Sequence, residues 1–502
     1  MSGPLYLVPQ EADQPAGPQG NERTMQLALP WSRRSQARPP AAPDPAPVLS
    51  ADPLDELAEQ LAEVCAAAVH PFEIAAFLEA DGVNDQQAAL RYGRPDAFTL
   101  AEELFAKVPR HYRATAAAPA NPWQVSPWRC LVRGLVFALP ALGYLLGSGW
   151  FDPHYLKFGM PDGAAALAAA TVVAWAWNQA LAHRTYSWLA RGRRRQAGRC
   201  LAVGAPVGAL LAMAAAWVVG AEWPALWFTA GQCLYMAAAT VLLSLGRARH
   251  LLYGLAPVAA GAGALALTPL PSTVRAAILL ASLAGLLVLA GRALLGCLRA
   301  GGEPGRPPAL SGQLPQALFG LAAGVLTLLA GNAGLFTGHG GAAGGLGGPA
   351  MLSISLSLGL AEWLLYRYRE LAVRALHTAT RPGEFARRSI RQLAGCLLGY
   401  LAALAVLDAL IGLLWPGGRA PAALPVLAIV LLGAALWLAL LLNAFGLSRT
   451  VAAACCLGAG LELSALSAGT AAVTAQLVGC GLVAVLLGAV AAPVLGRVTP
   501  HR

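Results

Sequence analysis

Apolar runs of about 20 residues recur along this chain and restrict its fold, because this is the length that an α-helix needs to cross a bilayer. Only 12% of the residues are charged and 57% are hydrophobic, so a soluble protein of this size would lack the surface to stay dissolved. We place the spans at roughly 130–148, 163–182, 201–220, 225–245, 251–269, 275–295, 314–336, 350–367, 393–415, 422–445, 449–468 and 472–495.

The spans fall into two groups of six on either side of a polar break between Gly291 and Pro315. In this break arginine alternates with glycine and proline, which interrupt a helix, and arginine resists entry into lipid. The sequence therefore predicts an all-α polytopic membrane protein with about twelve transmembrane helices. We expect two six-helix halves, 129–296 and 314–496, joined by a cytoplasmic linker at 297–313.

The basic residues indicate which side of the membrane each connection faces. With the N-terminus inside, the outer connections hold only Lys157, Arg275 and Arg419, and the other arginines of the connections fall inside. We therefore expect a cell-membrane protein with both termini in the cytoplasm. The net charge is +10, but the arginines lie mainly in short loops between the spans, where they act as orientation signals. We therefore expect no nucleic-acid partner.

The region before the first span divides into three parts. Residues 1–50 are rich in proline and alanine and are predicted to be disordered, without the apolar core of a signal peptide. Residues 51–113 show four short amphipathic helical patterns, with Asn84 and Asp96 as candidate N-caps, and predict a small cytoplasmic helical head. Residues 114–128 form a linker to the bilayer.

Two resemblances accompany these patterns. The stretch HPFEIAAFLEADGVNDQQAALRYGRPDAFTLAEELFAKVP, residues 70–109, resembles N-terminal segments of predicted bacterial multi-span proteins of unassigned role. The layout of six plus six spans with a central linker is similar to that of MATE-like transporters and polysaccharide flippases. The loop HRTYSWLARGRRRQAGRC lacks the aspartate of the major-facilitator signature and argues against that family. The similarity of layout implies a transporter with two parallel repeats.

Polar residues at membrane depth are the candidate site, because each one costs free energy unless it faces a cavity or a partner. Carboxylates could load and unload a coupling cation, and amides could assist them. Alternatively, Asp408 and Glu462 reach water near the outer end, while Glu362 pairs with Arg367 or Arg369. The candidates for substrate or ion binding are Glu362, Asp408, Glu462, Asn332 and Asn443.

The inner connection from Tyr366 to Arg391 is unusually basic and is interpreted as a loop. Its arginines could bind anionic lipid head groups, although topology signalling explains part of their number. The candidate contacts are Arg367, Arg369, Arg387, Arg388 and Arg391.

Inside the spans, Pro140, Pro206 and Pro257 favour bends, and the pair Gly320 and Gly324 is typical of close helix packing. None of the nine cysteines has the spacing of a zinc site. We expect no metal, no cofactor and no enzymatic activity, since enzyme signatures are missing.

Two hypotheses remain. The first is an integral membrane transporter, specifically a flippase or exporter of a lipid-linked glycan or another amphipathic anionic substrate. The second is a non-transporting scaffold, whose helical head recruits a cytoplasmic protein partner to a cell-envelope or export assembly.

Overall fold

The structure is a computed structural model that describes residues 52–109, 125–147, 162–301, 308–336, 347–414 and 422–499. Within these ranges the regular elements are helices and no strand occurs, so the predicted all-α class is confirmed. The chain divides into two compact units: a small one within Gln10–Pro122 and a large one that includes Trp123–Arg502. Each unit is described by itself. The predicted disordered tail, 1–50, lies outside the described residues.

The small unit, called the head here, holds five short helices around one apolar core. Their bounds are α1 Pro53–Gln60, α2 Ala62–Ala67, α3 Pro71–Ala80, α4 Asp85–Tyr92 and α5 Ala97–Lys107. The first of the four predicted helical patterns is divided at Leu61 into α1 and α2, so five helices form where four were expected. Ile74, Leu78, Leu100 and Leu104 are buried in the core, as expected for an amphipathic pattern.

The two predicted N-caps of the head are present. The Asn84 side chain accepts a hydrogen bond from the backbone N–H of Gln87 at 3.0 Å, and Asp96 accepts one from Thr99 at 2.6 Å. The bonds from Thr99 favour the ionised carboxylate and hold the pKa of Asp96 below its usual value. Stability contributed by this cap is therefore present above the pKa of an unfolded aspartate and is lost as pH falls through the lowered pKa.

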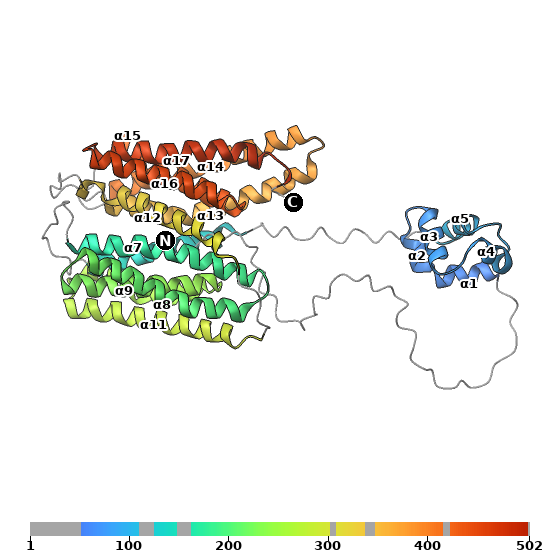
Figure 1. Cartoon of the computed structure of the whole chain (residues 1–502), viewed down its shortest axis with the longest axis horizontal. Coiled ribbons are helices and arrows are strands. Elements are labelled where there is room, and N and C mark those ends of the chain that lie inside the picture. Colours follow the sequence, from blue (N-terminus) through green and yellow to red (C-terminus); the bar gives the residue numbers. More distant parts are fainter. Residues whose placement is uncertain are drawn as a thin grey trace. The chain divides into compact units, whose positions relative to one another are not determined.

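In its described residues the large unit contains twelve long helices, each of which overlaps one predicted span (Figure 1). Their bounds are α6 Pro127–Gly147, α7 Asp162–Leu189, α8 Arg194–Val219, α9 Trp223–Ser244, α10 Ala248–Leu267, α11 Ser272–Leu298, α12 Gln313–Phe336, α13 Gly347–Thr378, α14 Pro382–Leu414, α15 Ala423–Ala444, α16 Ser448–Ser467 and α17 Ala472–Leu495. A short 3-10 turn, Leu310–Gly312, precedes α12.

Among the described residues, eleven of these helices are long and apolar enough to cross a membrane. The chain is therefore a multi-pass membrane protein. The helix outside that group is α13, which covers the predicted span 350–367 but carries charged residues through its C-terminal half. As expected, Pro140, Pro206 and Pro257 lie inside α6, α8 and α10.

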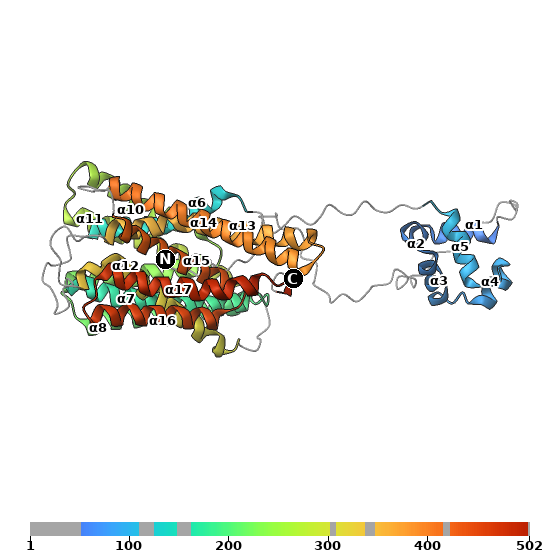
Figure 2. The ribbon, with the colours of Figure 1, turned by 90° about the horizontal axis from the view of Figure 1, so that it is seen from above.

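The twelve helices form two sets of six, and each set has its own apolar core. One core is built from α6 to α11, and the other from α12 to α17 with the addition of Cys130. Figure 1 shows the earlier helices (green) on one side and α14 to α17 (orange and red) on the other, with α12 and α13 between them; in Figure 2, seen from above, the two groups overlap. The linker bounds 297–313 stay a prediction, since 302–307 lie outside the described residues.

The two sets repeat the same pairings of helices. In each set the first helix packs on the fifth, the second on the third, and the sixth on both the fourth and the fifth. The helices α15, α16 and α17 begin at Ala423, Ser448 and Ala472, each 200 residues after the start of α9, α10 and α11. Gly246 and Gly446, also 200 residues apart, both turn the chain with a positive φ. We call these two sets repeat one and repeat two.

Candidate functional site

The repeats meet mainly along two helix crossings, α6 on α13 and α7 on α12, which together form the seam. Glycines let the backbones approach closely at both crossings. A Cβ atom added to Gly359 would lie 2.5 Å from the carbonyl oxygen of Cys130, and one on Gly320 would lie 2.6 Å from that of Trp175. The prediction that Gly320 serves close helix packing is therefore confirmed.

An ion pair with a buried acid and a partly exposed arginine crosses the seam beside the first crossing. The guanidinium of Arg133 on α6 donates to one carboxylate oxygen of Glu362 on α13, which is 1% exposed. Arg133 also interacts electrostatically with Tyr186 of α7 and Tyr366 of α13. The second oxygen of Glu362 is buried without a hydrogen-bond partner among the described residues. Three helices from both repeats thus converge on one ion pair.

The interpretation that Glu362 pairs with Arg367 or Arg369 is wrong. Arg367 instead bonds Glu370 at 2.8 Å, three residues away, and Arg369 donates to the carbonyl of Ala444 at 3.4 Å and covers the ring of Phe445. On a helix, side chains three or four residues apart are neighbours. A side chain five residues away points to another side, and one seven residues away lies two turns, about 10 Å, along the axis.

An amide lies at the second crossing. A Cβ atom on Gly320 would lie 2.8 Å from the Cγ of Gln179 on α7. The side-chain oxygen of Gln179 is buried without a partner among the described residues. The seam is therefore polar at both crossings, and only one of them carries the ion pair.

Asn443 also lies in a polar contact near the seam. Its side-chain oxygen accepts a hydrogen bond from Gln316 of α12 at 3.3 Å, while its amide nitrogen has no partner among the described residues. The side chain of Asn332, another predicted site residue, lies outside the described residues.

The two other predicted acids are buried within repeat two. Asp408 on α14 is 7% exposed and accepts a hydrogen bond from Ser353 at 2.8 Å. Glu462 on α16 is fully buried, and its closest recorded donor is the thiol of Cys480 at 3.9 Å. The alternative in which both side chains reach water at the outer end is therefore wrong, because neighbouring helices cover them.

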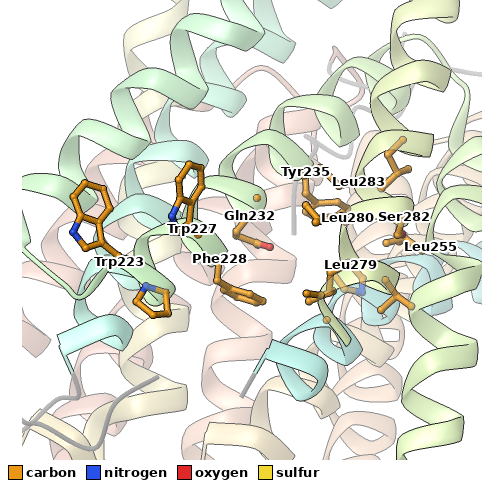
Figure 3. A pocket seen from close by; sticks show the side chains of 17 residues that line it. Trp223, Trp227, Phe228, Gln232, Tyr235, Leu255, Leu279, Leu280, Ser282 and Leu283 are labelled. Carbon is orange, nitrogen blue, oxygen red and sulfur yellow. The ribbon is translucent and has the colours of Figure 1, made fainter. Parts of the chain in front are cut away.

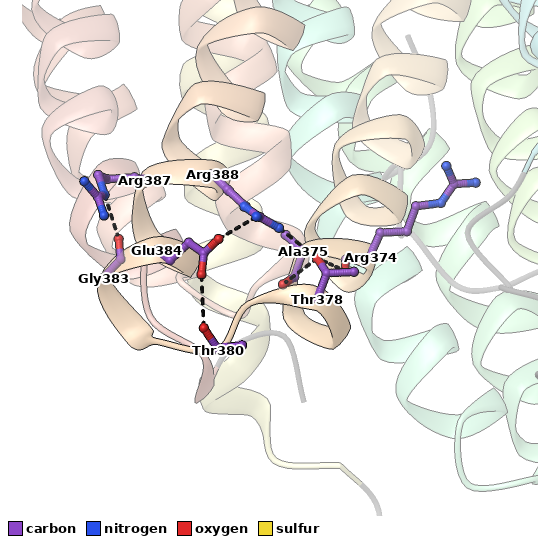
Figure 4. Close-up of polar contacts among 8 residues, drawn as sticks. All are labelled: Arg374, Ala375, Thr378, Thr380, Gly383, Glu384, Arg387 and Arg388. Atoms are coloured by element: carbon purple, nitrogen blue, oxygen red, sulfur yellow. Dashed lines mark hydrogen bonds and ion pairs between the residues drawn. The ribbon is translucent and has the colours of Figure 1, made fainter.

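The segment from Tyr366 to Arg391 is not the predicted loop. The helix α13 continues to Thr378 and α14 begins at Pro382, so most of the segment is a helical hairpin (Figure 4). Tyr366 and Tyr368 are buried in the core of repeat two instead of facing lipid head groups. Ion pairs one turn apart keep the charged stretch helical, as in the pair of Arg374 with Glu370 at 2.5 Å.

The predicted head-group arginines fall into two groups: some form contacts within the protein, and others are exposed and could contact an anion. Arg388 pairs with Glu384 and also bonds the hydroxyl of Thr378, while Arg367 and Arg369 have the contacts given above. In the part of the chain that is described, Arg387 and Arg391 are exposed and form no ion pair. Arg387 donates only to the carbonyl of Gly383, at 3.4 Å. These two lie one turn apart on α14 and remain the best candidates for anion contacts.

Repeat one contains an apolar cavity of about 520 Å³ between α6, α9, α10 and α11. Figure 3 shows Trp223, Trp227 and Phe228 at one end and Leu279 and Leu283 toward the other, with the amide of Gln232 among them. Its volume is that of a site for a small molecule or a hydrocarbon chain. Sequence reasoning missed this cavity, although Gly143 and Gly231 in its wall, which lack side chains, were a visible signal.

Comparison of the chain with protein-family models, with curated proteins and with solved structures finds no significant match.

Proposed function

We propose that this protein is a membrane transporter whose two repeats move against each other along the seam. The observation that carries the proposal is the buried Arg133–Glu362 pair, which joins α6 of one repeat to α13 of the other. A buried ion pair contributes little net stability, because desolvation offsets the attraction, so its best-supported role is to specify one arrangement out of several.

The architecture supports such a movement. Each repeat has its own apolar core, so each can move as a body without exposing that core. The contact between them is confined mainly to two helix crossings with glycines at the closest points. Among the described residues, one side-chain oxygen of Gln179 and one of Glu362 are buried without a hydrogen-bond partner, and both would gain partners from water or substrate when the repeats part.

The proposed substrate is amphipathic and anionic, as a lipid-linked glycan would be. The apolar cavity of repeat one has the size and lining to hold a hydrocarbon chain at bilayer depth. Arg387 and Arg391, which form no ion pair with the described residues, present two cations on one face of α14 that suit an anionic head group. Orientation by positive charge would place this hairpin, and both chain termini, in the cytoplasm of a bacterial cell.

Movement of the seam is testable without knowledge of the substrate. A single cysteine replaces Gln316, which is buried at the seam, in a chain whose nine native cysteines are changed to serine or alanine. If the protein has alternating access, some molecules are open to the cytoplasm and others to the outside. A membrane-impermeant maleimide should then label position 316 when it is added from either side. A cysteine at Arg391 should react from the cytoplasmic side alone. Labelling of position 316 from one side only, or from neither, would contradict the proposal.

Filling the cavity should block occupation by hydrocarbon. Gly231 lines the cavity and Leu431 stands 200 residues later in repeat two, so Gly231→Leu inserts the side chain that the other repeat carries. We expect several-fold less cross-linking of a phospholipid with a photoreactive acyl chain to Leu280 and Leu283, measured by mass spectrometry. Gly285→Leu on α11 is the matched control, since open space surrounds that glycine. Equal cross-linking in both variants would rule out the cavity as the chain-binding site.

A scaffold remains the second candidate, and the head favours it. Phe72 and Phe98 form an edge contact with ring centroids 5.6 Å apart on the surface of the head, and Leu90 is 90% exposed nearby in sequence. Exposed apolar side chains of this size suit a docked partner. Deleting residues 1–113 separates the two functions: a transporter keeps lipid cross-linking and alternating access, whereas a scaffold loses its partner in co-purification.

A further inference from the structure

The carboxyl group of Glu462 lies in a part of repeat two that contains no other charge. The helix α16 packs against α12, α17 and, less extensively, α15. None of these three helices contains a charged residue. The other charged residue of α16 is Arg449, 13 positions away, which corresponds to about 20 Å along a helix. No cation of the packed helices can therefore neutralise Glu462.

The residues shown against Glu462 are Cys480 and Gly479 of α17. From α17, the thiol of Cys480 faces one carboxylate oxygen, and Cys480 in turn interacts with Cys455 of α16. The other carboxylate oxygen is buried with no partner among the described residues, and so is the amide nitrogen of Gln476, which is 4% exposed. Gln476 precedes Cys480 by one helical turn and so lies on the same face of α17.

Gly479 makes the space that the carboxyl group occupies. A Cβ atom on Gly479 would lie 2.9 Å from the Cβ of Glu462 and 3.1 Å from its carboxylate oxygen. Any side chain at position 479 would therefore displace the acid. The carboxyl group of Glu462 has its space because residue 479 is a glycine.

Repeat one shows that the fold does not need this acid. The residues 200 positions earlier are Ala262 for Glu462, Ala276 for Gln476 and Leu279 for Gly479, and the last two line the apolar cavity. The same place thus holds an empty apolar volume in one repeat and a buried carboxyl group with an amide in the other. Because packing alone is satisfied without polar residues, the polar set in repeat two calls for a functional explanation.

We propose that Glu462 is a proton-binding site through which this transporter is coupled to a proton gradient, an inference that rests on the proposed function. An ionised carboxylate without a cation would be too costly at this depth, so the group holds a proton in the arrangement seen here. A local opening beside Glu462, within repeat two and distinct from movement at the seam, would admit water; the O–H bond of the carboxylic acid then breaks and the proton passes to water. The amide of Gln476 then donates a hydrogen bond to the carboxylate that remains.

Infrared spectroscopy of the full-length protein in lipid nanodiscs tests this directly. At neutral pH we expect the carbonyl band of a protonated, buried carboxylic acid, which loses intensity in Glu462→Gln and persists in Glu222→Gln, where the acid is exposed. Glu462→Asp should shift the band without abolishing it, and it serves as the reporter if the glutamine variant fails to fold. The proposal is overturned if the band is absent from the wild type, if both glutamine variants retain it equally, or if added sodium ions remove it at constant pH.

This readout is independent of movement at the seam. A protein with the carboxylic band but with one-sided labelling at position 316 would retain the proton site and lose the transporter proposal. A protein with alternating access but no such band would lose proton coupling alone.

Discussion

Replacing Arg133 with leucine should strongly destabilise the membrane unit. The substitution leaves Glu362 buried without its cation, and breaking one side of a buried pair costs about 3–5 kcal/mol. The double variant Arg133→Leu with Glu362→Leu should recover most of this loss, because two apolar side chains replace two charges. Thermal unfolding of the purified protein in detergent measures both effects.

The control for this substitution is Arg129→Leu, one helical turn away on α6, where the arginine is exposed and its removal should change stability little. The double variant should also lose the specified arrangement of the repeats, which would appear as altered labelling at position 316. If Arg133→Leu is as stable as Arg129→Leu, the ion pair does not exist in the membrane.

The second large effect is expected at Gly359. A leucine there would place its Cβ 2.5 Å from the carbonyl oxygen of Cys130 and 3.0 Å from the Cα of Leu131, and backbone atoms cannot rotate away as side chains do. The helices α6 and α13 must move apart, which costs about 1–3 kcal/mol or more. We expect a lower unfolding temperature together with separation of Arg133 from Glu362.

Gly399→Leu is the matched control, because it introduces the same side chain into repeat two at a helical glycine with open space around it. It should leave the unfolding temperature close to that of the wild type. Equal effects of the two substitutions would mean that α6 and α13 do not approach each other closely at Gly359.

The positions of the helices could be predicted from the sequence because each one carries its own signal. A run of apolar residues at membrane length is local information, and so are the caps at Asn84 and Asp96. The prediction failed where charge density was taken as a sign of a loop. In the stretch around Glu370 and Glu384, acids one turn from arginines neutralise the charge and let α13 and α14 extend as helices.

The contacts of the candidate site could not be predicted in the same way. Glu362 and Asp408 were recognisable as unusual residues, but their partners, Arg133 and Ser353, lie on other helices far along the chain. A single sequence shows the periodicity of apolar residues in each helix. It does not show which faces of the helices contact each other. The cavity is a more extreme case, since it is defined by side chains that are absent, as at Gly231.

The seam has a bearing on how such a chain could arise. Its crossings, the first helix of each repeat on the second helix of the other, are those of a symmetric pair of identical six-helix subunits. In an ancestral homodimer, any substitution would have altered both subunits at once. Fusion of two gene copies would release that constraint. One repeat could then keep an apolar cavity while the other acquired a buried acid at the equivalent position.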